Sequence, residues 1–251
     1  MTAHLTVLAT LALAILFSPE TLIVGLIIAS DKKVPRQASL AFSLGAVVGI
    51  VFATGIGMWI AALTGMSEAP HHPSWPGFIV RVVIAVALLA IGLYRAVAAL
   101  RHKPIADPTE PGYTPSRLRE ALAERFPGLA RRLNPEVDLP VRQRIGRAGL
   151  IGFVVGGLHP KVFPIAIAAG HQLLAISDRS DRLVGIVVFA GIALVPAVAP
   201  TVIELVRPGA AGRIKEGYER LMKVHGRWLV AVLLIAAAAF VGHNAFDHMP
   251  R

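Results

Sequence analysis

Residues 4–30 read HLTVLATLALAILFSPETLIVGLIIAS, a predominantly apolar run that Ser18-Pro19-Glu20 interrupts near its middle. A helix needs about 20 apolar residues to cross roughly 30 Å of hydrocarbon, so this run is long enough to span a membrane. Proline lacks an amide hydrogen and disfavours helical backbone at the residue before it. Ser-Pro-Glu is also typical of a helix start, with Ser18 as N-cap, Pro19 in the first helical position and Glu20 next. The stretch therefore predicts a transmembrane helix that is broken, with a second half-helix beginning near the midplane.

Five more apolar blocks follow along the chain, at residues 38–63, 78–100, 148–176, 183–206 and 228–246. Hydrophobic residues make up 55% of the 251 residues and charged residues 16%, whereas a soluble domain carries roughly a quarter charged residues. The backbone of a segment in lipid must satisfy its own hydrogen bonds, which favours helices. The first block has no basic residues before it and no A-x-A-like cleavage site after it, so we expect a retained span rather than a signal peptide. The sequence predicts an all-α membrane protein with six transmembrane helices.

The basic residues lie between the apolar blocks and give the chain a formal net charge of +10. Nineteen Lys and Arg residues lie in the first, third and fifth loops, against two in the second and fourth. By the positive-inside rule the odd loops are cytoplasmic and both termini lie outside, in a multi-pass protein of the plasma (inner) membrane. In a soluble protein this charge would suggest nucleic acid. Here we expect no nucleic acid, and anionic lipids of the cytoplasmic leaflet as the partner.

The long third loop, residues 101–147, divides the chain into the segments 1–100 and 148–251. Thr114-Pro115 resembles a helix start, and apolar residues then recur near helical spacing. We expect an interfacial amphipathic segment here, although a disordered basic loop stays open as an alternative. The fifth loop carries a shorter set of the same kind, at Ile214, Tyr218, Leu221 and Met222.

Three blocks precede the long loop and three follow it, so the two halves would be inserted upside down relative to each other. Such inverted repeats recur in transporters. The fourth block carries His159-Pro160-Lys161 where the first carries Ser18-Pro19-Glu20, and Pro160 predicts a second broken helix. The fold expected from the sequence is thus two inverted three-helix repeats.

Two half-helix starts facing each other would present unpaired N–H groups and positive dipole ends, to which Lys161 adds a full charge. We expect an anionic group to bind there, with Glu20 as its counter-charge or as a proton carrier. A charge at mid-bilayer costs about 2.5–3.5 kcal/mol on insertion scales, so neither residue should face lipid. A structural Glu20–Lys161 ion pair that only locks the halves together is the alternative.

Other polar residues give weaker signals. His171 is either a proton relay or a core residue. Arg81 and Arg95 lie near opposite ends of the third block and Glu204 near the end of the fifth, so we expect their side chains to snorkel to the interface.

Glycines at four-residue spacing let membrane helices approach closely. They occur as Gly45 with Gly49 and as Gly152 with Gly156, so we expect the spans that carry them to be internal. His71 and His72 lie in a loop without carboxylates beside them, and the chain has no cysteine. With no hydrolase elbow, no H-E-x-x-H and no paired acidic motif, we expect no metal, no cofactor and no enzymatic activity.

Ser18-Pro19-Glu20, the basic loop 31–36 and the glycine-studded block 38–63 resemble the first half of the LysE-type exporter superfamily. Residues 157–170, GLHPKVFPIAIAAG, are similar to the second-half Asn-Pro-Lys segment of its mycobacterial branch, the sulfolipid- and peptidoglycolipid-addressing (Sap/GAP-like) proteins. This chain departs from that pattern by having His159 in place of the asparagine. An imidazole can titrate near neutral pH and an amide cannot, which leaves the substrate open and hints at proton coupling.

The resemblance covers nearly the whole chain. It implies six helices, an inner-membrane location and outward movement of a cell-envelope glycolipid or its anionic precursor by alternating access. An exporter of small solutes such as amino acids or cations is one alternative. A non-transporting scaffold that holds envelope-lipid export machinery through its basic loop is another, and the protein could act as a homodimer in any of these roles.

Overall fold

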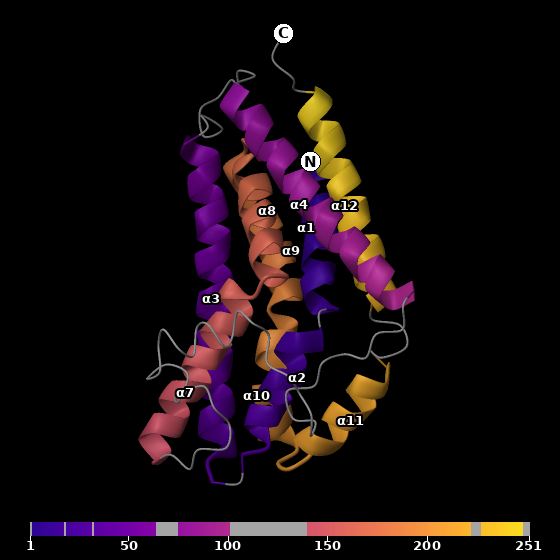
Figure 1. Cartoon of the computed structure of the whole chain (residues 1–251). Helices are drawn as coiled ribbons and strands as arrows, with labels where there is room; N and C mark the ends of the chain where they lie inside the picture. The colour runs from indigo at the N-terminus through magenta and orange to yellow at the C-terminus, as the bar shows by residue number, and fades with distance from the viewer. Residues whose placement is uncertain are drawn as a thin grey trace, which may run out of the picture.

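The computed structural model describes residues 2–17, 19–31, 33–63, 75–100, 140–221 and 227–247 (Figure 1). All regular structure in these ranges is helical, which confirms the all-α prediction for them. The elements are α1 Thr2–Leu16, α2 Pro19–Ala29, α3 Pro35–Leu63, α4 Trp75–Leu100, α7 Val141–Phe153, the π-helix η1 Val154–Leu158, α8 Val162–Leu174, α9 Arg179–Ala193, α10 Val195–Val206, α11 Ala211–Leu221 and α12 Arg227–Asp247.

Two of these helices, α3 and α4, are each long and apolar enough to cross a membrane unbroken. Three further spans form only when two bent helices are taken together. The bend is 45° between α1 and α2, 61° between α7–η1 and α8, and 54° between α9 and α10. The apolar part of α12, Trp228–His243, is shorter than a clear span. The described residues therefore support up to five spans, and the sixth stays a prediction.

The bends follow from proline. α2 begins at Pro19, and α8 begins just after Pro160. His159, which precedes that proline, has extended backbone at φ −63° and ψ 131°, as pre-proline sterics favour. Its carbonyl accepts the N–H groups of Val162 and Phe163, at 3.0 and 2.9 Å, so the new helix starts directly after the break. Pro196 near the start of α10 likewise removes an N–H that would have continued α9.

The fourth span starts earlier than its apolar block predicts, at Val141 rather than near residue 148. The added turns carry Arg142, Arg144 and Arg147, whose straight-chain side chains are good helix formers. Hydropathy alone missed them because these turns are polar, although their backbone is helical.

The helices pack as crossed pairs. α3 lies along α7, η1 and α8, while α1 packs on α9, α2 on α10, and α4 on α12 (Figure 1). The predicted glycines lie at the α3–α7 crossing. A Cβ added to Gly45 would come within 2.0 Å of the Gly149 carbonyl oxygen, and one added to Gly152 within 2.1 Å of the Phe42 carbonyl oxygen. Gly49 and Gly156 meet backbone atoms of the facing helix in the same way. The two backbones are thus in direct contact.

The connections lie at two opposite ends of the molecule (Figure 1). The end of α2, the starts of α3 and α7, the end of α10 and the whole of α11 share one end, which we call the basic end. It carries Lys33, Arg36, Arg142, Arg144, Arg147, Arg207, Arg213 and Lys215. The start of α1 and the end of α12 point toward the other end. This arrangement matches the predicted loop order, while the side of the membrane on which each end lies stays a prediction.

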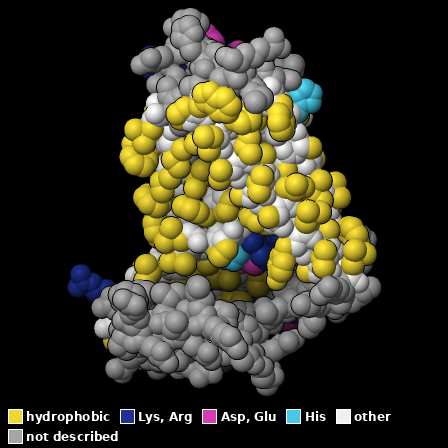
Figure 2. Space-filling model, turned by 45° about the horizontal axis from the view of Figure 1, so that its top comes forward, with side chains coloured by type: hydrophobic (Ala, Val, Ile, Leu, Met, Phe, Trp, Pro, Cys, Tyr) yellow, Lys and Arg dark blue, Asp and Glu magenta, His cyan; other side chains and the backbone are white. Residues whose placement is uncertain are grey.

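An apolar belt lies between these ends, and Figure 2 shows its hydrophobic side chains over most of one face. Large hydrophobic residues are exposed on α3, α4, α9, α10 and α12, as expected for helices that face lipid. The core lies between α1, α8 and α12 and includes Leu8, Leu11, Ile165, Leu173 and Leu234. The short amphipathic segment expected in the fifth loop forms α11.

Several sequence-based predictions fall outside the described residues. They are the N-cap Ser18, the loop histidines His71 and His72, Met222 of the fifth loop, and the amphipathic segment expected within residues 101–139.

Candidate functional site between the broken helices

The two helix breaks bring Glu20 and Lys161 together. Glu20 lies in the first turn of α2, and Lys161 is the N-cap residue of α8. The Lys161 Nζ donates a hydrogen bond to Glu20 Oε1. These residues are 141 positions apart in sequence, and only the paired breaks place them side by side.

Arg95 of α4 is the third member of this centre. Its Nη2 lies 3.4 Å from Glu20 Oε1, the same oxygen that Lys161 contacts, and its side chain is only 7% exposed. The expectation that Arg95 snorkels to the interface is wrong. α4 buries one helical face, on which Arg95 follows Leu88 and Gly92, so its side chain points to Glu20 inside the protein. The same spacing is visible in the sequence and could have identified the residue.

His159 shapes the start of α8. Its Nδ1 accepts a hydrogen bond from the backbone N–H of Lys161 at 3.3 Å. This role requires an unprotonated Nδ1 on a neutral ring. An asparagine side-chain oxygen caps helix starts in the same way, so an asparagine at this position could accept the same hydrogen bond.

The balance of charge in the centre is positive. Among the described residues the centre has two cations, Lys161 and Arg95, and one carboxylate, Glu20. The N-termini of α2 and α8 add roughly half a positive charge each. The Lys161 side chain is 34% exposed and that of Glu20 is 23% exposed, so the centre is accessible. Figure 2 shows a recess in the apolar belt at which basic, acidic and histidine side chains meet. The arrangement is suited to binding an anion.

The other predicted candidate, His171, lies apart from this centre. It follows Lys161 by ten residues on α8, or about 15 Å along the helix axis. Its side chain is buried, and neither ring nitrogen has a hydrogen-bond partner among the described residues. The neighbouring Gln172 contacts His4 of α1, with 3.2 Å between Oε1 and Nδ1. Pro19 and Pro160 stand at the two breaks, as the sequence placed them.

A polar contact links α3 to α10 nearer the basic end. The Ser43 hydroxyl donates to the Ala197 carbonyl at 2.7 Å and lies 2.6 Å from the Thr201 hydroxyl. One turn further along α10, Glu204 is buried and accepts the Gly209 N–H at 3.2 Å. The prediction that Glu204 snorkels is therefore wrong, because its carboxylate caps the turn that follows α10.

A second ion pair closes the basic end between the α2–α3 connection and α7. The Arg144 guanidinium donates to Asp31 at 2.8 Å, and the same carboxylate accepts the N–H groups of Lys33 and Val34. Burial raises the pKa of Asp31, but these backbone hydrogen bonds and the arginine outweigh it and hold the pKa below its usual value. Asp31 is therefore a firmly ionised anchor for Arg144.

Comparison with curated proteins and with solved structures gives no match. The family model of Sap, the sulfolipid-1-addressing protein, matches residues 8–247, and the chain therefore belongs to that family.

Proposed function

We propose that this protein moves an anionic cell-envelope lipid outward across the plasma membrane, with the head group held by Lys161 and Arg95. The observation that carries the proposal is the Glu20 carboxylate, which these two cations share and which is partly exposed, as is the Lys161 side chain. The family takes its name from a sulfolipid, and the sulfate that this class name implies is an anion of the kind such a centre attracts.

In this proposal the Glu20 carboxylate occupies the anion position of the centre until the substrate binds. This carboxylate neutralises Lys161 and Arg95 while no lipid is bound. A lipid head group must displace it, and a proton taken up by Glu20 favours that exchange. Proton-coupled outward transport follows naturally from a carboxylate that competes with the substrate for the same cations. The excess of positive charge favours an anionic substrate over the cations that a small-solute exporter could carry.

Reciprocal packing supports alternating access by two inverted repeats. The first broken span, α1 and α2, packs on α9 and α10, which form the second span of the other half. The other broken span, α7–η1 and α8, packs on α3, the second span of the first half. The third spans, α4 and α12, pack on each other. This exchange of partners is what a two-fold axis in the membrane plane generates.

The position of α4 and α12 supports entry from the basic end. These helices contact α1 and α8, whereas the half of the molecule built from α2, α7 and α10 lies beyond them (Figure 1). A lipid beside these helices could therefore keep its acyl chains in the bilayer while its head group reaches the partly exposed Lys161. We propose that this conformation is open toward the cytoplasmic leaflet.

The test is outward flux of a fluorescent sulfated glycolipid in proteoliposomes that contain the purified full chain. We expect Lys161→Ala to lower the flux at least tenfold at normal insertion, and Arg213→Ala, which removes an exposed cation at the basic end, to change it less than twofold. Glu20→Gln should remove any dependence of the flux on an imposed pH gradient. Unchanged flux in Lys161→Ala would contradict the site.

Deleting residues 107–140 distinguishes a transporter from the alternative of a non-transporting scaffold. Flux that persists in liposomes after this deletion supports a transporter. No intrinsic flux in the intact chain, together with partner capture that is lost on deletion, supports a scaffold.

A further inference from the structure

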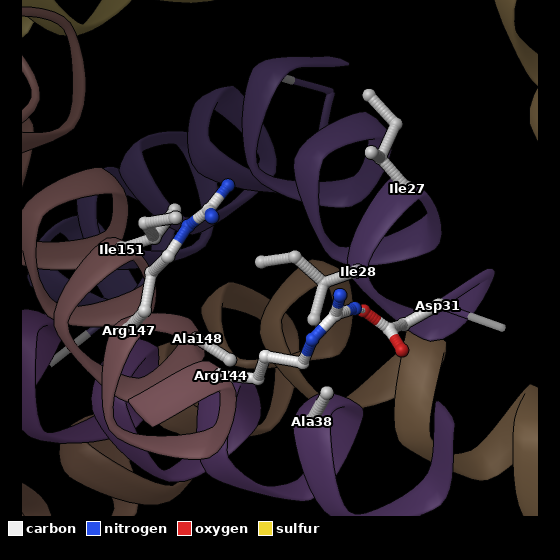
Figure 3. Close-up of a pocket in the computed structure, with 8 residues that line it drawn as sticks. All are labelled: Ile27, Ile28, Asp31, Ala38, Arg144, Arg147, Ala148 and Ile151. Carbon is white, nitrogen blue, oxygen red and sulfur yellow. Dashed lines mark hydrogen bonds and ion pairs between the residues drawn. The ribbon is translucent and has the colours of Figure 1, made fainter. Parts of the chain in front are cut away.

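A second basic pocket lies between α2 and α7 at the basic end, apart from the centre at the helix breaks. Its volume is about 160 Å³ (Figure 3). Isoleucine and alanine side chains form most of its wall, and Asp31, Arg144 and Arg147 supply its charges. The pocket exists because α2 packs mainly on α3, α10 and α11 and touches α7 only lightly.

The charges in the pocket do not balance. Arg144 extends across it to Asp31, while the Arg147 side chain ends beside Ile151, away from that carboxylate (Figure 3). Within the part of the chain that the structure describes, no hydrogen bond or ion pair of Arg147 is found. Among the described residues that line the pocket, Asp31 is thus the one carboxylate beside two guanidinium groups, and Arg147 is placed to bind a further anion.

The volume and the lining of the pocket favour a small oxyanion with an apolar group attached. The volume of about 160 Å³ is below the roughly 300–1,000 Å³ of a drug-sized site. A phosphate or sulfate group fits, but a whole glycolipid does not. Because Ile27, Ile28 and Ile151 line the pocket, the atoms attached to the oxyanion meet apolar side chains. Guanidinium groups bind such tetrahedral oxyanions through paired hydrogen bonds.

The pocket and the Glu20 centre share α2. Ile27 follows Glu20 by seven residues, which places the pocket about 10 Å along the helix toward the basic end. A head group that leaves the pocket along α2 therefore reaches Lys161 after a short displacement.

We propose that the pocket binds the phosphate or sulfate head group of an anionic lipid from the leaflet at the basic end, with Arg147 as its principal ligand and Arg144 as the second. The site deepens the proposed function by giving the lipid a first docking point, but binding to it does not require transport. Asp31 holds Arg144 in place and limits the pocket to one anion.

The test measures the dissociation constant of a short-chain phosphatidylglycerol for the purified full chain in phosphocholine micelles. We expect Arg147→Gln to weaken binding at least tenfold. The matched control is Arg142→Gln on the same helix, which removes an exposed cation outside the pocket and should change binding less than twofold. Arg147→Lys should bind between wild type and Arg147→Gln, because it keeps the charge and loses the paired geometry. Equal binding by wild type and Arg147→Gln, or equal loss in Arg142→Gln, would overturn the proposal.

Two further arms identify the source of the anion. Short-chain phosphatidylcholine should bind at least tenfold more weakly than phosphatidylglycerol. Inorganic phosphate and sulfate should compete only at concentrations far above that of the lipid. Full competition by either ion at equal concentration would assign the pocket to a soluble oxyanion and overturn the lipid assignment.

Flux and binding measured in the same variants separate this site from the transport proposal. We expect Arg147→Gln to weaken phosphatidylglycerol binding at an unchanged thermal unfolding temperature, whereas Arg142→Gln should change neither quantity. A wild-type protein without flux would contradict the proposed function, but the phosphatidylglycerol affinities of wild type and Arg147→Gln could still be compared to test the pocket.

Discussion

Removing the Arg95 guanidinium is the sharpest test of the anion-binding centre, because the change should weaken substrate binding without leaving a buried charge unpaired. Arg95 and Lys161 contact the same oxygen of Glu20. In Arg95→Gln the carboxylate keeps Lys161 as its partner, so the centre becomes a neutral pair. The folded state should therefore tolerate the change, in contrast to the usual cost of about 3–5 kcal/mol for breaking a buried pair.

The expected loss follows from the geometry. An anion that displaces Glu20 would lie about 4 Å from each cation, where Coulomb attraction is about 4 kcal/mol at an effective dielectric constant of 20. The Lys161 side chain is 34% exposed, so solvent and salt reduce this attraction to about a third to two thirds of that value. The remaining 1.4–2.8 kcal/mol corresponds to roughly 10- to 100-fold weaker binding.

The assay is the dissociation constant of a sulfated glycolipid for the protein in phosphatidylcholine nanodiscs. Arg95→Lys should recover most of the affinity because it keeps the charge. Glu20→Gln should bind more tightly than wild type because it removes the competing carboxylate. Wild-type affinity in Arg95→Gln would refute the reasoning, as would an equal loss for an uncharged lipid with the same acyl chains.

Three further predictions concern the scaffold of the site. Gly152→Ala places a Cβ 2.1 Å from a backbone oxygen of α3 and should lower the free energy of unfolding by about 2–3 kcal/mol. The Cβ of Gly55→Ala meets nothing within 4 Å, and this variant should raise the free energy of unfolding by about 0.5–1 kcal/mol. Both values are measured by unfolding in detergent. His159→Asn should keep the melting temperature because an amide oxygen can accept the Lys161 N–H, while His159→Leu removes the acceptor and should cost about 1 kcal/mol. Because its pKa is held below its usual value, Asp31 should stabilise the fold at neutral pH, and this contribution should disappear as the pH falls through the lowered pKa. Melting temperatures of wild type and Asp31→Asn should therefore differ at pH 7 and converge below pH 4, and a constant difference would contradict the assignment.

Proline was sufficient to predict the helix breaks at Pro19 and Pro160. Pro19 and Pro160 act on the backbone within one or two residues, so their effect is readable without tertiary information. The charge pattern predicted which loops share one end for the same reason, since it depends on sequence position alone. The bend between α9 and α10 also lies where Pro196 stands, although the sequence did not predict its size.

Arg95 was missed because its position near the end of an apolar block suggested an interfacial side chain. That inference assumed that α4 ends at the membrane surface on both sides. The packing of α4 on α12 instead leaves Arg95 beside Glu20. The spacing of Leu88, Gly92 and Arg95 indicates the packed face of α4, but the contact with Glu20 also depends on the relative depth of two helices, which no local pattern contains.

The polar contacts at the basic end could not be predicted from the sequence either. Arg144 and Asp31 are 113 residues apart, and their pairing requires α7 to begin seven residues before the apolar block that predicted it. The extra turns are helical for reasons of propensity, whereas the pairing depends on the crossing of α3 and α7. Sequence reasoning treated the arginines as signals for orientation and overlooked that they line a pocket.

The way the helices pack also explains how binding and movement would be linked in the proposed mechanism. One set of helices comprises α1, α2, α9 and α10, with α4 joined to it through α12, and the other comprises α3, α7, η1 and α8. The two sets also touch where α3 meets α2 and α10 and where α1 meets α8. Glu20 and Arg95 belong to the first set and Lys161 to the second, so separating the sets breaks the Glu20–Lys161 contact and leaves Glu20 with Arg95. Lys161 then needs a new counter-charge, because an unneutralised ammonium inside the membrane costs several kcal/mol. An anionic head group supplies that charge. Separation of the sets should therefore be rare without substrate and frequent with it, which is the coupling that a carrier requires and a static ion-pair lock does not provide.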